Sequence, residues 1–299
     1  MQKTRKSYYG AAIAAFSIWG LFSFALKPLK VYASIDILFY RVFFAASMLL
    51  FYAYILRSKK MKENHQRFNL LTVKQKKRTI YLTLFGGALL TGNWFVFIFV
   101  INQVSIKAAA YAYLVCPILT TLIAYFVLKE KLLKNQWVAI GISILSIIIL
   151  AIYNFKDLLF SMIVAVSYSL YLVSQRKNIY VDKLPILTYQ MVFSAFILLP
   201  FYPTFSAPLP TESLFYILIA LIAVMFTIIP LLLNLYAIEG LPSATVGILL
   251  YLNPILNFVV AIIFFDEKTT FSQLVSYSLV ALSIAVFNQH LFKKKQVEI

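Results

Sequence analysis

The sequence predicts an all-α integral membrane protein with ten transmembrane helices, arranged as two inverted five-helix repeats. Three observations lead to this fold class. Of the 299 residues, 62% are hydrophobic and 12% are charged, whereas a soluble domain is about half apolar and about a quarter charged. The chain also contains ten long apolar segments, and its second half repeats the spacing of key residues of the first. A surface so poor in charge is predicted to face lipid.

Each predicted helix is an apolar run that meets or approaches the ~20 residues needed to cross the hydrocarbon core of a bilayer. Helices are expected because backbone polar groups in lipid must pair within their own segment. The runs are continuous, which disfavours the alternating strands of a β-barrel. The predicted spans are residues 8–26, 35–56, 79–101, 108–128, 136–153, 158–175, 184–202, 214–237, 244–265 and 272–292.

The basic residues are distributed unevenly between the two predicted sides of the membrane. If the N-terminus is inside, 21 of the 27 Lys and Arg residues lie on the cytoplasmic side, five lie on the outer side, and Arg41 lies within a helix. Cytoplasmic loops of membrane proteins carry this kind of excess. The pattern predicts that both termini are cytoplasmic, and it explains the net charge of +17 without nucleic acid as a partner.

Residues 57–78 form the one long polar stretch, with nine basic residues and a single acidic residue, Glu63. We expect a loop that rests on anionic headgroups, because basic clusters next to a membrane are attracted to them. We favour a simple positive-inside anchor over a regulatory role. Membrane lipids are therefore expected partners.

An internal repeat relates the two halves of the chain. A shift of 137 residues brings a proline, a glutamate followed by lysine, and a glutamine onto their counterparts, and a shift of 149 relates the earlier helices. We therefore divide the chain into residues 1–153 and 154–299, with five helices in each. Because five is odd, the second half must insert upside down. The matched positions are Pro117 with Pro254, Glu130 with Glu267, and Gln136 with Gln273.

Inverted repeats with a site near the midplane are the architecture of many secondary transporters. The pattern therefore predicts a transporter of a small-molecule substrate that works by alternating access. The alternative is a non-transporting membrane protein, such as a lipid-handling or assembly factor on the same scaffold. We predict no enzymatic activity, metal or cofactor. His65 and His290 have no ligand partner at metal-binding spacing, and the chain has no glycine-rich phosphate loop.

Arg41 is the sharpest candidate for a binding residue, because it lies about six residues into the second predicted helix. A charge inside the membrane costs ~2.5–3.5 kcal/mol at the centre of a helix and by default indicates function. Arg41 could bind a substrate carboxylate or change partners between access states. The alternatives are a structural pair with Asp36, or a side chain that reaches the outer headgroups.

Polar and aromatic residues near the middle of other helices complete the candidate site. A polar face within lipid must point toward protein or a cavity, although hydrogen bonding between helices explains each residue singly as well. Prolines interrupt three helices and are candidate hinges. The substrate-binding candidates besides Arg41 are Trp19, Asn93, Trp94, Tyr111, Thr227, Asn234, Tyr251 and Asn253, with Tyr168 and Tyr171 as further aromatics. The candidate hinges are Pro117, Pro230 and Pro254.

Several of these residues belong to motifs that resemble the RarD branch of the EamA transporters. The match runs in order along nearly the whole chain. It departs at Tyr40, where the branch usually has histidine, and at Lys129, where it usually has glycine. The motifs are Ile18-Trp19-Gly20, Tyr40-Arg41, Asn93-Trp94, Tyr111 to Leu119, Glu130-Lys131-Leu132, Gln136-Trp137, Leu241 to Gly247 and Asn253-Pro254.

The resemblance implies membership of the drug/metabolite transporter superfamily. It implies ten helices in two EamA repeats, and movement of small organic solutes across the bacterial cytoplasmic (inner) membrane. It leaves open which solute is carried, whether transport is export or uptake, what energy drives it, and which oligomeric state the protein adopts.

Overall fold

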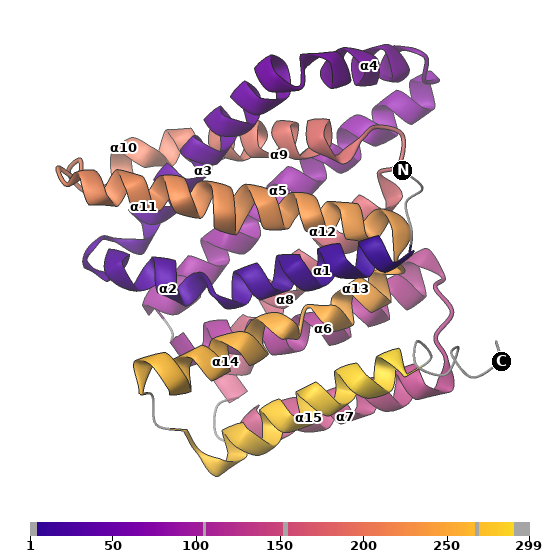
Figure 1. Ribbon diagram of the computed structural model, residues 1–299, viewed down its shortest axis with the longest axis vertical. Helices are drawn as coiled ribbons and strands as arrows, with labels where there is room; N and C mark the ends of the chain where they lie inside the picture. The colour runs from indigo at the N-terminus through magenta and orange to yellow at the C-terminus, as the bar shows by residue number, and fades with distance from the viewer. Residues whose placement is uncertain (1–4, 104–105, 152–154, 267–268, 290–299) are drawn as a thin grey trace.

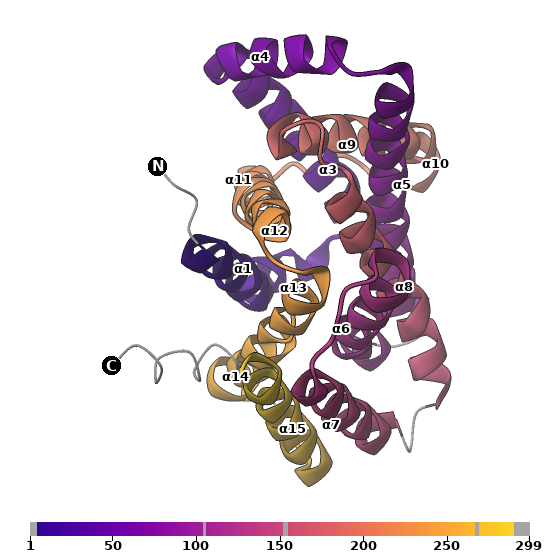
Figure 2. The same ribbon diagram turned by 90° about the vertical axis from the view of Figure 1, so that its right-hand side faces the viewer.

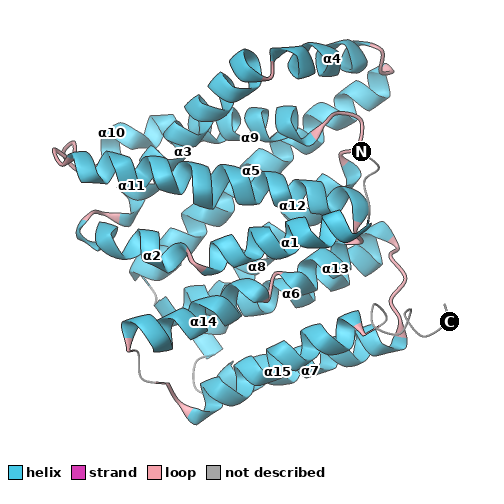
Figure 3. Ribbon diagram, in the orientation of Figure 1, coloured by secondary structure: helices cyan, strands magenta, loops and turns pink. Residues whose placement is uncertain are grey.

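The fold is described from a computed structural model that covers residues 5–103, 106–151, 155–266 and 269–289. The side chains of residues 34, 98–112 and 151–161 are not described. Within the described residues the chain forms helices and connecting turns, and no strand (Figure 3). The helices of the first half are α1 (Arg5–Gly20), α2 (Phe22–Leu26), α3 (Ser34–Phe51), α4 (Ser58–Asn69), α5 (Val73–Gln103), α6 (Ile106–Leu128) and α7 (Lys134–Ala151). Those of the second half are α8 (Phe155–Lys177), α9 (Lys183–Leu198), α10 (Tyr202–Phe205), α11 (Ser213–Ala223), α12 (Ile229–Gly240), α13 (Ser243–Leu249), α14 (Leu252–Phe265) and α15 (Phe271–Asn288).

The predicted all-α membrane fold is confirmed. Within the described residues, seven helical segments are long and apolar enough to cross a membrane, and two shorter apolar helices accompany them. Each of the ten predicted spans overlaps a helix, but the count of ten crossings stays a prediction. The seven segments are Arg5–Val31, Ile35–Leu56, Val73–Phe97, Lys183–Phe205, Ser213–Gly240, Ser243–Phe265 and Phe271–Asn288, and the shorter ones are Tyr113–Leu128 and Lys134–Leu150.

The long helices lie side by side and mix the two halves of the chain (Figure 1). In contact are α6 with α8, α7 with α15, α1 with α12, and α5 with both α8 and α9. Fully buried side chains such as Phe16, Leu49, Tyr171 and Leu235 form the main core. The start of α1 and the end of α15 lie at the same end of the bundle. Figure 2 shows α1, α11 and α12 closer to end-on and α5 from the side, with α4 lying across one edge.

Three of the membrane-spanning segments are interrupted near their middle. The first is interrupted at Leu21, between α1 and α2. The segment of α11 and α12 contains a π turn, Val224–Ile228, directly before Pro230. Between α13 and α14 the helix breaks at Leu250 and Tyr251, three residues before Pro254.

Pro117 does not interrupt its helix, contrary to the prediction. Helix α6 continues through it. Proline cannot donate a backbone hydrogen bond, but the helix around Pro117 is well supported. The Thr121 hydroxyl donates to the Pro117 carbonyl at 2.8 Å, and Gly247 of α13 lies close to that same carbonyl. Packing against α13 therefore keeps α6 continuous.

The polar stretch 57–78 is not a loop, contrary to the prediction. It forms α4 and the start of α5, where Thr72 and Gln75 exchange side-chain-to-backbone hydrogen bonds as a capping box. Helix α4 is amphipathic, since Met61 and Asn64 are buried on one side of it. Its helical pattern is hard to read because lysines surround only a few apolar residues.

The ends of α6 and α14 are alike. Lys129 and Asp266, which directly follow these helices, have left-handed backbone angles, with φ of 58° and 49°. They are 137 residues apart, the shift that relates the two halves of the sequence. Next to Lys129, the Glu130 carboxylate accepts the backbone N–H groups of Ser243 and Ala244 at 2.8 and 3.0 Å. A residue of the first half thus caps α13 of the second.

Candidate functional site

The candidate site lies where the three interrupted segments adjoin. Helix α1 packs against α12 and α14 and also contacts the π turn. Irregular backbone at membrane depth is tolerated only where protein buries it or a water-filled cavity receives it. Broken helices that meet at the midplane form the binding sites of many transporters. The adjoining interruptions therefore locate the candidate site near the middle of the bundle.

Trp19 and Pro230 meet at the π turn. In a regular helix the carbonyl of Phe226 would accept the N–H of residue 230, but Pro230 has none. The indole N–H of Trp19 donates to that carbonyl at 2.9 Å instead. Thr227 of the same turn donates its hydroxyl to the carbonyl of Ile222 at 3.1 Å. The predicted candidates Trp19, Thr227 and Pro230 thus belong to one structural feature.

Arg41 and Trp94, both predicted, form a pair. The guanidinium carbon of Arg41 lies 4.6 Å from the centre of the Trp94 ring, which is a cation–π distance. The buried Nε of Arg41 has no hydrogen-bond partner among the described residues. Asp36 does not pair with it, because the Asp36 carboxylate accepts the backbone N–H of Ala207 at 3.2 and 3.3 Å. The Arg41 cation therefore lies against an aromatic face, and its Nε–H is available to donate a hydrogen bond.

Asn93 joins two helices. Its side-chain amide donates to the carbonyl of Val164 at 2.8 Å and to the hydroxyl of Ser167 at 3.0 Å, both on α8. The side chain is buried. These contacts are interhelical bonds of the kind that the sequence left as an alternative for Asn93.

Asn234 and Tyr168 form a second polar group beside Trp19. The Asn234 amide donates to the Tyr168 hydroxyl at 3.1 Å, and the Trp19 and Tyr168 rings lie edge to face with centroids 6.1 Å apart. The buried Oδ1 of Asn234 and the Tyr171 hydroxyl have no partner among the described residues. Buried polar atoms normally have partners, so unpaired ones call for an explanation such as a ligand or water.

Asn253 links α14 to α2. Its Oδ1 accepts from the Asn257 amide at 2.8 Å, and Asn257 Oδ1 accepts from the Ser23 hydroxyl at 2.7 Å. Tyr251 is fully buried at the break before Pro254, and its hydroxyl has no partner among the described residues. The side chain of Tyr111, like residue Glu267, lies outside the described residues.

Two further polar groups on α6 were not among the predicted binding residues. Tyr113 of α6 lies close enough to Arg41 for the two to interact electrostatically. On the same helix, Thr120 donates to Ser169 of α8 at 3.0 Å, and Ser169 donates to the Cys116 carbonyl at 3.1 Å. The spacing of Tyr113, four residues before Pro117, was the available signal.

The arrangement suits recognition rather than covalent chemistry. It offers a cation stacked on indole, a carboxamide with a free oxygen, and aromatic walls from Trp19 and Tyr168. The described residues contain no group of three or more His, Cys, Asp or Glu side chains that could hold a metal ion. Cations, amides and aromatic faces are the kinds of groups that line small-molecule sites.

The comparisons with known proteins concern the family and the fold of the chain. The model of the EamA-like transporter family matches the chain twice, at residues 6–152 and 155–289. YojE, an uncharacterized transporter of Bacillus subtilis (strain 168), is 28% identical over an alignment 301 residues long. The alignment covers 98% of this chain and 97% of that protein. The protein RarD of Escherichia coli (strain K12) is 25% identical over 285 residues, or 92% of each chain.

A likeness to a solved crystal structure extends over the whole fold. That structure superposes with a TM-score of 0.73 and covers 96% of this chain and 99% of its own. The sequences are 15% identical, so the likeness concerns the fold alone.

Proposed function

The chain belongs to the EamA-like transporter family and is a multi-pass membrane transporter of the drug/metabolite kind, and from this premise we propose that it moves small organic solutes by alternating access. We place it in the bacterial cytoplasmic membrane with both termini inside. The excess of basic residues on that side supports this orientation. The two described chain ends lie at the same end of the bundle, which supports placing both termini on one side.

The proposal rests on one observation, the environment of the Arg41 side chain. Its guanidinium lies within a membrane-spanning helix, stacks on Trp94, and has an unpaired buried Nε. A charge in this position is costly, and it is usually explained by function. Guanidinium groups recognise planar anions such as carboxylates through paired hydrogen bonds. We therefore propose a solute with a carboxylate or a similar anionic group.

Alternating access needs elements with two stable arrangements, and the interrupted helices are suited to this role. Breaks at Leu21, at the π turn and at Leu250 divide their segments into outer and inner parts. Each part can tilt without breaking a continuous helix, because hinges absorb backbone change at a few residues. We propose that the two halves move relative to each other around Trp19 and Asn234.

The test is solute flux in proteoliposomes. Purified protein is reconstituted with a panel of labelled aromatic and aliphatic carboxylates, together with the matching carboxamides. We expect flux of at least one carboxylate and at least tenfold less of its carboxamide. Arg41→Gln and Asn234→Trp should each remove most of that flux, the first by losing the cation and the second by filling the site.

Lys27→Gln, at the end of α2, is the matched charge control and should leave flux unchanged. Melting temperatures in detergent show whether each variant is folded. Flux that persists in both site variants would place the pathway elsewhere. Ligand binding without any flux would favour the alternative, a non-transporting lipid-handling or assembly protein.

A further inference from the structure

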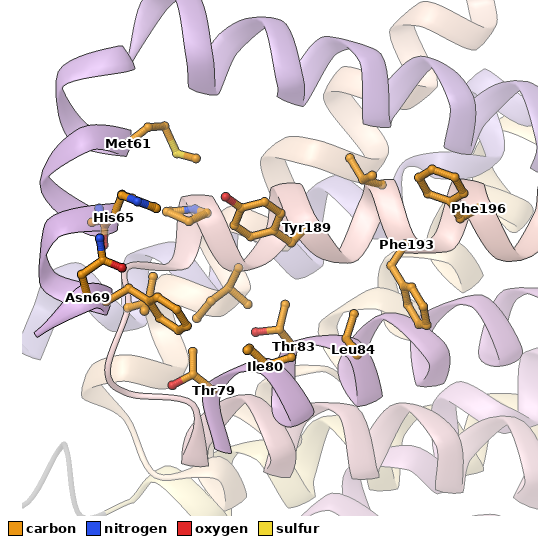
Figure 4. Close-up of a pocket in the computed structure, with 16 residues that line it drawn as sticks. Met61, His65, Asn69, Thr79, Ile80, Thr83, Leu84, Tyr189, Phe193 and Phe196 are labelled. Atoms are coloured by element: carbon orange, nitrogen blue, oxygen red, sulfur yellow. The ribbon is translucent and has the colours of Figure 1, made fainter. Parts of the chain in front are cut away.

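A cavity of about 540 Å³ lies outside the candidate site, between α4, α5 and α9 (Figure 4). Met61, His65 and Asn69 enter it from α4. From α5 and α9 come the remaining labelled residues, which are Thr79, Ile80, Thr83 and Leu84, and Tyr189, Phe193 and Phe196. The cavity has the volume of a small-molecule site. The proposed transport function makes no use of it.

One end of the cavity is apolar and open to the membrane. Leu84, Phe193 and Phe196 form it, and Phe196 is 69% exposed on the surface of a membrane-spanning helix. From Lys76 to Leu84 the helix rises by ~12 Å, at about 1.5 Å per residue. A lipid acyl chain can therefore enter this end from the bilayer without leaving the hydrocarbon.

The other end is polar, and Lys76 lies near it without lining the cavity. Lys76 occupies the same face of α5 as Thr79, Ile80 and Thr83, and its ammonium lies 5.9 Å from the centre of the Phe68 ring, which lines the cavity. Thr79 and Thr83 already have partners, the Gln75 carbonyl and the Asn178 amide. Recognition of a ligand at this end therefore falls to Lys76, His65, Asn69 and the remaining O–H of Thr83.

Helix α4 covers the cavity because Asp182 holds it in place. The Asp182 carboxylate accepts from the Asn64 amide at 3.1 Å and forms an ion pair with Arg67 at 3.2 Å. The Asp182 backbone N–H donates to the Asn64 side chain at 3.0 Å. Asn64 is buried, so its two bonds to Asp182 are partly shielded from water, whereas the Arg67 ion pair is exposed. Helix α4 is thus anchored to the rest of the protein by specific side-chain bonds.

We propose that this cavity is a binding site for an anionic glycerophospholipid. One acyl chain lies between α5 and α9 against Leu84, Phe193 and Phe196. The phosphate lies beside the Lys76 ammonium, with His65 and Asn69 as further polar contacts. Charge complementarity favours this occupant, because residues 57–78 carry nine basic side chains and one acidic one. The opening toward lipid favours it over a soluble phosphate.

The proposal stands independently of solute transport, so its test uses lipid binding alone. Purified protein in neutral detergent is mixed with equal amounts of phosphatidylglycerol and phosphatidylcholine that have the same chains, and bound lipid is measured by native mass spectrometry. We expect phosphatidylglycerol to predominate. Lys76→Gln should lower that preference about fivefold, because one basic residue near an anionic surface contributes about 1 kcal/mol. Lys77→Gln, one residue away and exposed, should not.

A second pair of variants tests the apolar end. Ile80→Trp fills the cavity and should reduce binding of both lipids, whereas Ile217→Trp, on the exposed face of α11, should not. Phosphatidylglycerol with a photoreactive group on its acyl chain should crosslink wild-type protein on α5 or α9 near Leu84 and Phe193. Free glycerol phosphate, added in excess, should not displace the lipid.

Three results would each overturn the proposal. They are equal binding of the two lipids to wild-type protein, an equal effect of Lys76→Gln and Lys77→Gln, and crosslinks confined to other helices. Displacement by glycerol phosphate would show a soluble-phosphate site in place of a lipid site. The crosslinking experiment uses wild-type protein, so it decides the matter even if Ile80→Trp folds poorly.

Discussion

Trp19 donates its indole N–H to the carbonyl of Phe226 at 2.9 Å, the carbonyl that would accept from residue 230 in a regular helix, where Pro230 has no N–H. A side chain of the first half thus completes the hydrogen bonding of a helix in the second. Trp19 and Pro230 are more than 200 residues apart, but both determine the hydrogen bonding of the Phe226 carbonyl.

The first prediction concerns this contact. Trp19→Phe keeps an aromatic ring but leaves the Phe226 carbonyl unpaired in a nonaqueous interior, which should destabilise the protein by about 1–3 kcal/mol. In a Pro230→Ala background the helix can supply its own N–H, so Trp19→Phe should cost clearly less there. Melting temperatures of the four proteins in one detergent give the comparison. Equal losses in both backgrounds would show that the hydrogen bond is not the reason for Trp19.

The second prediction concerns Gly20, where α1 approaches α14. A Cβ added there would lie 2.6 Å from the Leu256 Cβ and 3.2 Å from the Asn253 carbonyl oxygen. Gly20→Ala should therefore force the two helices apart, at a cost of about 1–3 kcal/mol. Gly141→Ala is the matched control, because a Cβ at that helical position meets nothing within 4 Å. It should leave the melting temperature unchanged or raise it, and a similar loss in both variants would contradict the packing argument.

The third prediction is that Lys129→Gly stabilises the protein. Lys129 has a φ of 58°, a left-handed conformation that costs a side-chain-bearing residue energy and costs glycine almost none. We expect a gain of about 0.5–1 kcal/mol, seen as a rise of a few degrees or less in melting temperature. Lys131→Gly, two residues on, relieves no such strain and should be neutral or destabilising. A loss of stability in Lys129→Gly would mean that its side chain makes an important contact.

The fourth prediction concerns Glu130, whose carboxylate caps α13. Glu130→Ala leaves the N–H groups of Ser243 and Ala244 unpaired, at a cost of about 1–2 kcal/mol. Glu130→Gln keeps one accepting oxygen and should cost less. Hydrogen exchange should speed up locally in α13, Ser243–Leu249. Glu63→Ala, an exposed acidic residue on α4, is the control and should change neither measurement.

Much of the fold could be predicted from the sequence, because long apolar runs have few alternatives in a membrane. Every predicted span overlaps a helix. The amphipathic helix α4 was not predicted, because its sequence is not a long apolar run. Its stability comes from tertiary bonds, chiefly those of Asn64 and Arg67 with Asp182, and local sequence does not show them.

The candidate site could be predicted in part. Arg41 and Trp94 stand out as a charge and an indole within apolar runs, and they do lie together. Asn93 and Asn234 look alike in sequence but differ in structure. Asn93 donates to two acceptors of α8, whereas the Asn234 Oδ1 has no partner among the described residues. Only tertiary contacts separate such amides, and they also explain why Tyr113 was overlooked.

The anchoring of α4 by Asp182 has a consequence for biosynthesis. Asn64 precedes its partner by 118 residues in the chain. At about 5–20 residues per second, a ribosome needs roughly 6–24 s to travel that distance. During this interval the basic helix emerges and meets the membrane surface without the Asp182 bonds that anchor it. Its lysines are thus the first means of retaining it there, and the carboxylate that fastens it is added only once the second half has begun to insert.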